Sequence, residues 1–310
     1  MTQTGTGKYE QLLERCRGLD PIPTAVAYPC EETALTGAIG AGKAGMIVPI
    51  LVGPAATIRA LAKEKGIDLG GVEIVDVPDS RAAAAKAVAL VREGKAELLM
   101  KGSLHSDEIL GAVVSKEGGL RTGRRLSHVF LMDVPTYHKV LVVTDGAINI
   151  APTLEDKVDI CQNAIDLARA FGVERPKVAI LAAVEMVSSR MPATLDAAAL
   201  CKMAERGQIK GGVFDGPLAF DNAISRDAAK IKGIASEVAG DPDILLAPDL
   251  EAGNMIAKQL SFLANADSAG LVLGARVPVI LTSRADSLRS RIASTAVAVL
   301  AAHARRRQAA

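Results

Sequence analysis

Short apolar runs rich in β-branched residues alternate with alanine-rich stretches along nearly the whole chain, and this alternation restricts the fold more than any other feature. Residues 24–28 (TAVAY) and 46–52 (MIVPILV) are predicted as buried strands, and residues 31–44 between them have helical composition. Strands separated by helices of this length form βαβ crossovers. We therefore expect an α/β protein with mostly parallel sheets covered by helices on both faces.

The remaining elements continue the pattern. Helices are expected at residues 54–65, 80–93, 154–171, 192–207, 252–264 and 287–305, and strands at 72–77, 97–100, 128–132, 140–143, 177–182, 212–214, 244–246, 270–273 and 277–282. No Ser/Gly-rich linker or low-complexity block separates domains. Only the loop at 144–153 interrupts the alternation of strands and helices, and we therefore predict one domain boundary near residue 140.

Composition excludes several classes of function. The 310 residues include 36 Lys and Arg against 35 Asp and Glu, and only 3% are aromatic. Such a chain has neither the basic footprint of a duplex-binding protein nor the aromatic faces on which single strands stack. We therefore expect no nucleic-acid partner.

The sequence also lacks motifs typical of metal sites, disulfide frameworks, secretion signals and membrane-spanning helices. The four cysteines and four histidines show no C-x-x-C or i,i+4 histidine spacing, so neither a bound metal nor a disulfide framework is expected. The first ten residues lack the apolar core of a secretory signal. The apolar run at 292–302 is too short to span a bilayer. These observations predict a cytoplasmic protein with no membrane partner.

One glycine motif resembles a nucleotide-binding signature. Gly40-Ala-Gly42-Lys-Ala-Gly45 satisfies G-x-G-x-x-G, and Gly37 to Lys43 satisfies the first part of a P-loop. Both motifs need a strand before the glycines and a helix after them. Here the predicted order is helix first and strand second, and Ala44 replaces the Ser or Thr that would hold Mg²⁺. We interpret the glycines as a small-residue helix face and its C-terminal turn.

Two polar corners follow predicted strands, where open α/β sheets bind ligands. Lys101-Gly102 follows the strand at 97–100; it is either a ligand site or a turn leading to a helix that starts near Asp107. The stretch 215–225 (DGPLAFDNAIS) follows the strand at 212–214. Its Gly-Pro predicts a turn, and Asp221-Asn222 either cap the next helix or line a cleft.

The strongest corner is the stretch 277–287 (VPVILTSRADS), which leads from a buried strand into the last helix. Ser283 and Ser287 offer hydroxyls, and Arg284 offers a planar fork of donors. A helix start adds free amides and the positive end of the dipole, so the corner suits a phosphate. The alternative is that Asp286 or Ser287 is an ordinary N-cap; both interpretations can hold together.

Four stretches together resemble the phosphate acetyltransferase / phosphate butyryltransferase family: LVLGARVPVILTSRADS, DGPLAFDNAIS, PDLEAGNMIAKQLSFLANADSAG and TDGAINIAPT. The resemblance implies a two-domain fold like that of isocitrate/isopropylmalate dehydrogenases, and a homodimer or higher homo-oligomer. The chain would cross to the second domain and return, giving a first domain of 1–140 plus 272–310 and a second of 141–271. The active site would lie in the cleft between them.

The implied reaction is acyl-CoA + phosphate ⇌ acyl phosphate + CoA with a short acyl group, acetyl or butyryl. Coenzyme A is then substrate and product, and no cofactor is expected. Ser283 and Arg284 match the family's Ser-Arg pair and are expected to bind phosphate. The residues expected to bind the rest of the substrates are Lys101, Gly102, Asn149, Asp221, Asn222 and Ser287.

The chain departs from the acetyltransferase pattern at two positions. Ser290 stands where typical members carry an Asp, seven residues after the site Ser, that is taken as the general base. Asp286 is the substitute hypothesis, and the Ser-Arg-Ala-Asp-Ser corner resembles the butyryl-type branch better. Gly111 stands where acetyltransferases carry an Arg, so part of the grip on CoA or phosphate is lost or supplied elsewhere.

Three other mechanisms or classes remain open. A covalent route would use an exposed cysteine, for which only Cys30 is placed suitably, and direct attack by phosphate in a ternary complex is preferred. An NAD- and divalent-metal-dependent dehydrogenase of the same fold would need Asp215, Asp221 and Asp249 to converge. A non-catalytic CoA-binding protein would explain the missing Asp.

Overall fold

The computed structural model describes residues 7–282 and 286–309. The chain forms two compact units, each described by itself. The central unit comprises Met1–Tyr9 and Arg125–Ser268, and the terminal unit comprises Glu10–Arg124 and Ala269–Ala310. These ranges are not those of the two domains that the family resemblance implies, and that division stays a prediction.

The sheet of the terminal unit has the strand order β3-β2-β1-β4-β11-β10. The strands are β1 (Ile22–Ala27), β2 (Ile47–Gly53), β3 (Glu73–Asp76), β4 (Leu98–Lys101), β10 (Asp267–Leu273) and β11 (Val279–Ile280). All neighbouring pairs from β3 to β11 are parallel, and only β10 runs antiparallel to β11. Leu51, Leu98 and Leu99 are fully buried, as expected for strands covered on both faces.

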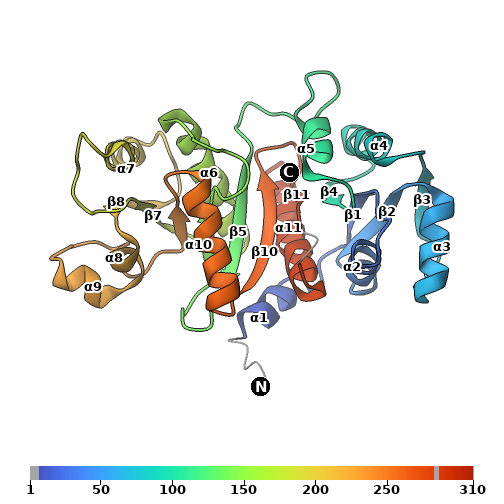
Figure 1. The fold of residues 1–310 in the computed structure, drawn as a ribbon, viewed down its shortest axis with the longest axis horizontal. Coiled ribbons are helices and arrows are strands. Elements are labelled where there is room, and N and C mark those ends of the chain that lie inside the picture. Colours follow the sequence, from blue (N-terminus) through green and yellow to red (C-terminus); the bar gives the residue numbers. More distant parts are fainter. Residues whose placement is uncertain (1–6, 283–285, 310) are drawn as a thin grey trace. The chain divides into compact units, whose positions relative to one another are not determined.

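The helices of the terminal unit are α2 (Glu32–Lys43), α3 (Ala55–Lys65), α4 (Ser80–Arg92), α5 (Ser106–Val114) and α11 (Leu288–Ala309). α2 packs against α3 and α11, while α4 packs against α5 (Figure 1). The buried alanines of α4, including Ala83, Ala84 and Ala87, let this helix approach the sheet closely.

The central unit has the strand order β5-β6-β9-β7-β8. Its strands are β5 (Ser127–Asp133), β6 (Leu141–Thr144), β7 (Lys177–Leu181), β8 (Val213–Leu218) and β9 (Ile244–Leu246). β5 and β6 are antiparallel, and the pairs from β6 to β8 are parallel. Its helices are α6 (Leu154–Ala170), α7 (Pro192–Glu205), α8 (Phe220–Ile224), α9 (Arg226–Ile231) and α10 (Leu250–Leu263).

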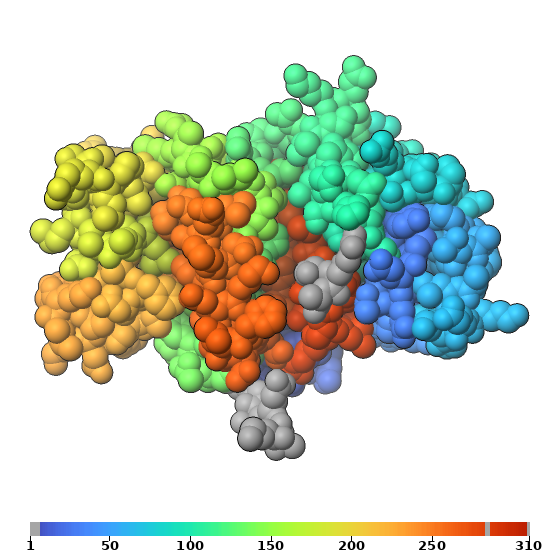
Figure 2. Space-filling model, viewed as in Figure 1, coloured from blue at the N-terminus to red at the C-terminus, as the bar shows by residue number. Residues whose placement is uncertain are grey.

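Hydrophobic packing holds the central sheet to its helices. Leu141, Val143 and Leu245 of the strands pack in one cluster with Ala257 of α10 and Ala229 of α9. α6 and α7 pack against each other, and α7 covers β8. In Figure 2, α10 lies at the surface of this unit, and its residues Met255 and Phe262 are exposed.

The predicted alternation of strands and helices is confirmed, but two local predictions are wrong and one helix was not predicted. The strand at 212–214 is the longer β8, which continues through Gly216-Pro217 where a turn was expected. Asp221 and Asn222 lie inside α8 and do not cap the following helix; Ser225 caps α9 by accepting a hydrogen bond from Ala228 N–H at 3.3 Å. α1 (Lys8–Glu14) was not predicted.

The glycine motif at 37–45 lies in α2 and its C-terminal turn, as interpreted from the sequence. Its glycines allow close packing: a Cβ on Gly37 would lie 3.2 Å from the side chain of Arg291, and one on Gly42 would lie 3.2 Å from Pro49. Gly45 has a φ of 72° in the turn that ends the helix. The motif therefore serves packing and helix termination.

Candidate functional site

Two of the predicted polar corners are brought together by the register of the terminal sheet. β11 pairs in parallel with β4, and Val279 and Ile280 lie opposite Leu99 and Met100. The carboxyl ends of the two strands therefore lie side by side, although they are about 180 residues apart in the sequence. Lys101-Gly102 and Leu281-Thr282 continue from this edge, where ligands bind in open α/β sheets.

The backbone around Gly102 is fixed against β1. Gly102 N–H donates to the Ala27 carbonyl and Ser103 N–H to the Tyr28 carbonyl, both at 2.8 Å. A Cβ on Gly102 would lie 2.5 Å from the Tyr28 carbonyl oxygen, so only glycine fits. Lys101 is buried beside it. The Ser103 hydroxyl is buried and has no hydrogen-bond partner among the described residues, which leaves it available to a ligand.

The helix that follows this corner begins at Ser106, close to the position expected from the sequence. The Glu108 carboxylate accepts hydrogen bonds from the His105 backbone N–H at 2.9 Å and from the Ser80 hydroxyl at 2.6 Å. These hydrogen bonds, from Ser80 first, lower the pKa of the Glu108 carboxyl. Gly111, in the middle of α5, has open space around its Cβ position.

Ser283 and Arg284, the residues expected to bind phosphate, lie outside the described residues. Residues on both sides of them interact with Arg291, in the first turn of α11. Arg291 is buried and donates from Nη1 to the Thr282 hydroxyl at 2.8 Å. Burial lowers the pKa of this guanidinium, and the negative charges of Asp286 and Glu31 oppose the shift. Arg291 thus holds Thr282 and lies close enough to Asp286 for their charges to interact.

Ser287 caps α11, which confirms the N-cap interpretation of this residue. Its Oγ accepts a hydrogen bond from Ser290 N–H at 3.1 Å, and its carbonyl accepts one from Arg291 N–H at 3.1 Å. The Ser290 hydroxyl lies 3.2 Å from the Ser287 hydroxyl. Ser290, at the position where the family resemblance implies an Asp, therefore places a hydroxyl within the cap.

The predicted residues Asp221 and Asn222 belong to a charged cluster in the central unit. The Lys232 ammonium lies 3.1 Å from Asp221 Oδ2 and 3.2 Å from Glu185 Oε2. Asn222 Nδ2 donates to the same Glu185 oxygen at 3.2 Å, while its buried Oδ1 has no partner among the described residues. Lys232 lowers the pKa of the Asp221 carboxyl. The pKa of Glu185 is lowered by its own backbone N–H and then by Lys232.

Asn149 has a structural set of contacts. Its Nδ2 donates to Asp145 Oδ2 at 2.6 Å and to the Leu126 carbonyl at 2.8 Å, and its Oδ1 accepts from Arg125 Nε at 2.7 Å. Asp145, which is buried, also accepts from the backbone N–H groups of Ala147 and Ile148. These contacts hold the loop after β6 in place. Substrate binding by Asn149 stays a prediction.

The cysteines are poor nucleophiles. Burial, followed by the charge of Glu31, raises the pKa of the Cys30 thiol to about 11, and burial raises that of Cys201 to about 12. Cys161 and Cys201 lie in α6 and α7, as expected. A thiolate is the reactive form, so these values disfavour an acyl-cysteine intermediate at neutral pH.

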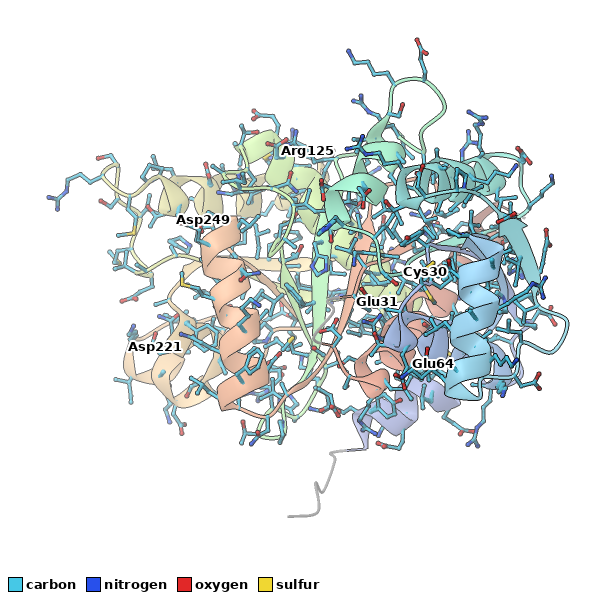
Figure 3. All side chains as sticks on the ribbon, turned by 45° about the vertical axis from the view of Figure 1, so that its right-hand side comes forward. Cys30, Glu31, Glu64, Arg125, Asp221 and Asp249 are labelled. Atoms are coloured by element: carbon cyan, nitrogen blue, oxygen red, sulfur yellow. The ribbon has the colours of Figure 1, made fainter. Side chains whose placement is uncertain are left out.

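The carboxylates of the rival dehydrogenase hypothesis do not converge. Asp249 caps α10 by accepting from Ala252 N–H at 2.8 Å, and Figure 3 shows it on a different element from Asp221. Asp215 accepts from Gly216 N–H. Within residues 7–282 and 286–309, no three His, Cys, Asp or Glu side chains form a group that could hold a metal ion. In the same part of the chain, no helix is long and apolar enough to cross a bilayer.

The sequence analysis did not predict Arg291, Glu185 or Lys232 as parts of these sites. Arg291 had a usable signal, because a cation in the first turn of a helix opposes the dipole and needs a specific partner. Ser103 directly follows Lys101-Gly102 and belongs to the small polar residues of that predicted corner. Glu185 and Lys232 had no signal in the sequence, since only the fold brings them close to Asp221.

A family model and curated relatives match most of this chain. The family model described as "Phosphate acetyl/butaryl transferase" matches residues 79–299, which contain every predicted site residue. The phosphate acetyltransferase of Rhizobium meliloti is 64% identical over 302 residues, covering 97% of this chain and 95% of the relative. The phosphate butyryltransferase of Clostridium acetobutylicum is 42% identical over 294 residues, covering 95% of this chain and 98% of the relative.

A solved structure matches the fold over nearly the whole chain. The branched-chain phosphotransacylase from Enterococcus faecalis has a TM-score of 0.79 and 30% sequence identity, covering 91% of this chain and 99% of that one. This match confirms the α/β fold class with mostly parallel strands and the dehydrogenase-like architecture expected from the sequence. The chain belongs to the phosphate acetyl/butyryl transferase family.

Proposed function

We propose that the chain transfers a short acyl group from coenzyme A to inorganic phosphate, giving acyl phosphate and free CoA. The observation that carries the proposal is the family match over residues 79–299, which spans both polar corners that β4 and β11 bring together. Acyl-CoA and phosphate are the substrates, and CoA is a product rather than a resident cofactor. The match favours this reaction over the dehydrogenase and over a non-catalytic CoA-binding protein.

The reaction needs a held nucleophile and a stabilised oxyanion. Ser283 and Arg284 hold phosphate in this proposal, and the first-turn amides of α11 face charge that develops at the thioester carbon. Lys101 adds a cation at the adjacent strand end. Direct attack in a ternary complex is supported by the raised pKa of Cys30, the cysteine nearest a strand end.

The general base is Asp286 in this proposal. A thiol has an ordinary pKa of about 8.5, so CoA leaves with little help, but the reverse direction gains from a base. Ser290 supplies a hydroxyl where related acetyltransferases supply a carboxylate. Asp286 is the carboxylate next to Ser287 whose charge acts on Arg291. Substrate binding by Asp221, Asn222, Asn149 and Ser287 belongs to the same proposal.

We infer that acetyl-CoA is the preferred substrate, because identity to the relative named phosphate acetyltransferase is 64% and identity to the one named phosphate butyryltransferase is 42%. The finer expectation of a homodimer is supported by apolar side chains on α10, where Phe262 is 76% and Leu263 82% exposed. A monomer mass in light scattering would contradict the homodimer.

The test is thiol release from acetyl-, propionyl- and butyryl-CoA, with and without phosphate. We expect phosphate-dependent release, fastest with acetyl-CoA; each methylene in an apolar pocket is worth about 1–3 kcal/mol. Initial rates with both substrates varied should give converging lines, whereas parallel lines would indicate a covalent intermediate. No phosphate-dependent release would refute the transferase, and a butyryl-CoA optimum would refute the substrate preference.

The same assay tests the base in the thiol-consuming direction. Asp286→Asn should lower that rate by at least tenfold, because the CoA thiol then lacks a proton acceptor. A near-normal rate would remove Asp286 from this role. Asp267→Asn, in the same chain but outside both polar corners, serves as the control.

A further inference from the structure

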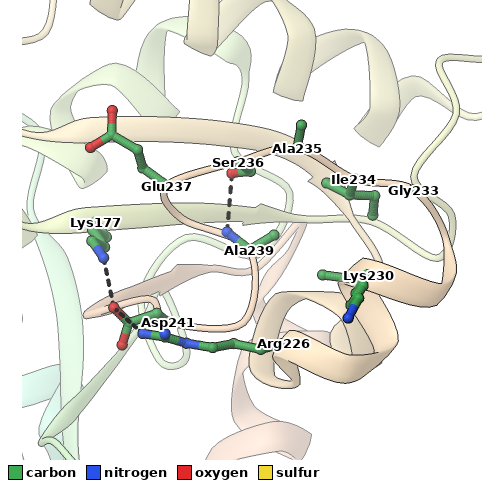
Figure 4. A pocket seen from close by; sticks show the side chains of 11 residues that line it. Lys177, Arg226, Lys230, Gly233, Ile234, Ala235, Ser236, Glu237, Ala239 and Asp241 are labelled. Carbon is green, nitrogen blue, oxygen red and sulfur yellow. Dashed lines mark hydrogen bonds and ion pairs between the residues drawn. The ribbon is translucent and has the colours of Figure 1, made fainter.

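The central unit has a cavity at the edge of its sheet opposite the edge that carries Asp221 and Asn222. The cavity has a volume of about 560 Å³ and is lined by Lys177, Arg226, Lys230, Ser236 and Asp241, among others (Figure 4). Lys177 is the first residue of β7, and Asp241 precedes β9. Asp221, Asn222 and Glu185 follow the carboxyl ends of β8 and β7. We call this cavity the α9 pocket.

Asp241 organises the cations around the α9 pocket. Its carboxylate lies 2.6 Å from the Lys177 ammonium, 3.1 Å from the Lys139 ammonium and 3.1 Å from Arg226 Nη2. His138 Nε2 is a fourth neighbour at 2.8 Å. A carboxylate offers about four lone-pair positions, so these contacts use its accepting capacity. Asp241 thus holds these cations in place, and its carboxylate has no accepting position left for a further cation.

Several donors on the wall of the pocket are still unused. Lys230 lies one helical turn after Arg226, on the same face of α9, and its ammonium makes no ion pair with any described residue. The Arg226 side chain is 72% exposed, and only Nη2 contacts Asp241. Ser236 Oγ accepts from Val238 N–H at 3.0 Å and Ala239 N–H at 3.1 Å, so its own proton is left to donate.

The floor of the pocket is apolar. Ala229, Ala239 and Ile234 line it and pack on the core cluster that includes Val238 and Tyr137. Glu237 is the second carboxylate of the lining, and it is exposed. The unused donors of the lining therefore suit an anion, and the apolar residues suit an organic group attached to that anion.

We propose that the α9 pocket is a binding site for a small phosphorylated organic metabolite, separate from the substrate residues. A phosphate monoester has three terminal oxygens, and the Arg226 fork, the Lys230 ammonium and the Ser236 hydroxyl of the pocket lining are donors suited to them. The volume of about 560 Å³ exceeds what the phosphate alone needs and lies within the range of small-molecule sites. This site adds a ligand that the acyl-transfer reaction does not require.

Calorimetric titration with glucose 6-phosphate at fixed ionic strength tests the proposal, with glucose as the unphosphorylated probe. Wild type should bind the phosphate ester and not the sugar. The double variant Arg226→Gln/Lys230→Gln should bind at least tenfold more weakly. The control Lys210→Gln/Lys258→Gln removes the same charge from exposed positions outside the pocket and should bind like wild type.

Two further measurements keep the result decisive. Lys230→Gln alone breaks no ion pair of the described chain, so it should unfold at the same urea concentration as wild type and still bind glucose 6-phosphate more weakly. Saturating CoA should not displace glucose 6-phosphate, and all variants should keep the wild-type rate of thiol release. The proposal is overturned by absent binding, by equal affinity in the pocket and control variants, or by displacement by CoA.

Discussion

Arg291 positions the residues on either side of the proposed phosphate-binding pair, Ser283 and Arg284. It is buried, holds the Thr282 hydroxyl at 2.8 Å and acts electrostatically on Asp286. Gly37 of α2 leaves the room for it, since a Cβ there would lie 3.2 Å from Arg291 Cδ. Gly37, which begins the P-loop-like motif of the sequence, therefore contributes to the proposed phosphate corner by leaving space for Arg291.

Arg291→Gln should raise the KM for phosphate and lower kcat/KM at least tenfold. The shorter amide cannot hold Thr282 and interact with Asp286, and Thr282 directly precedes the proposed phosphate residues. The unfolding free energy should fall by about 1–3 kcal/mol, the cost of leaving a buried polar group unsatisfied. Steady-state kinetics with phosphate varied, and urea unfolding, measure the two effects.

Arg289→Gln is the matched control. Arg289 is two residues earlier on α11 and pairs at the surface with Glu10 at 3.2 Å. Exposed pairs contribute about 0–1 kcal/mol, so this variant should keep both stability and kinetics near wild type. Equal kinetics for the two variants would show that Arg291 does not position the corner.

At the scale of the elements, the packing of β4 against β1 makes Gly102 irreplaceable. Gly102→Ala should lower the unfolding free energy by about 2 kcal/mol or more, because its Cβ meets backbone oxygens that cannot rotate away. Gly111→Ala is the paired variant, on α5 with open space around the new methyl group. It should gain about 0.5–1 kcal/mol from the reduced freedom of the unfolded chain.

Urea unfolding of both variants at one pH measures these changes. Similar stability of Gly102→Ala and wild type would mean that the strand ends separate at little cost. A less stable Gly111→Ala would mean that the glycine has a contact outside the described residues or in an oligomer. Either result would revise the account of this corner.

The elements also show what the sequence could predict. Apolar runs such as 46–52 located β2 and most other strands, because burial on both faces demands continuous apolar composition. Gly216-Pro217 misled the prediction of β8, since the same dipeptide is typical of turns. Local pattern predicted Lys101-Gly102 and the 277–287 stretch as separate corners; their adjacency depends on the β4–β11 register, which is a long-range property.

At the scale of the whole molecule, acid stability depends on two buried polar groups of the central unit. His128 on β5 is buried, and its Nδ1 has no hydrogen-bond partner among the described residues. Burial lowers the pKa of its imidazole, and Asp145 only partly opposes this. At Asp241, burial raises the carboxyl pKa, but contacts with Lys177, Lys139 and His138 together hold it well below its usual range.

These shifts predict two pH windows in which stability is lost. The unfolded chain takes up a proton at His128 below about pH 6.5 while the folded chain does not, so stability falls as pH drops from there, by at most about 1.4 kcal/mol per pH unit. The contribution of Asp241 is complete above its unfolded pKa of about 4 and is lost as pH falls further toward the folded pKa.

Urea unfolding from about pH 7.5 to about pH 3 spans the unfolded pKa values of both side chains. It therefore separates the contribution of His128 to stability from that of Asp241. His128→Gln should flatten the loss of stability in the upper window and leave the lower one. Asp241→Asn should do the reverse, so each variant is the control for the other. If the His128→Gln curve ran parallel to wild type in the upper window, another group would have to take up the proton. That result would mean that the pKa of His128 is the same in the folded and unfolded chains, against the desolvation that burial on β5 imposes on a charged imidazole.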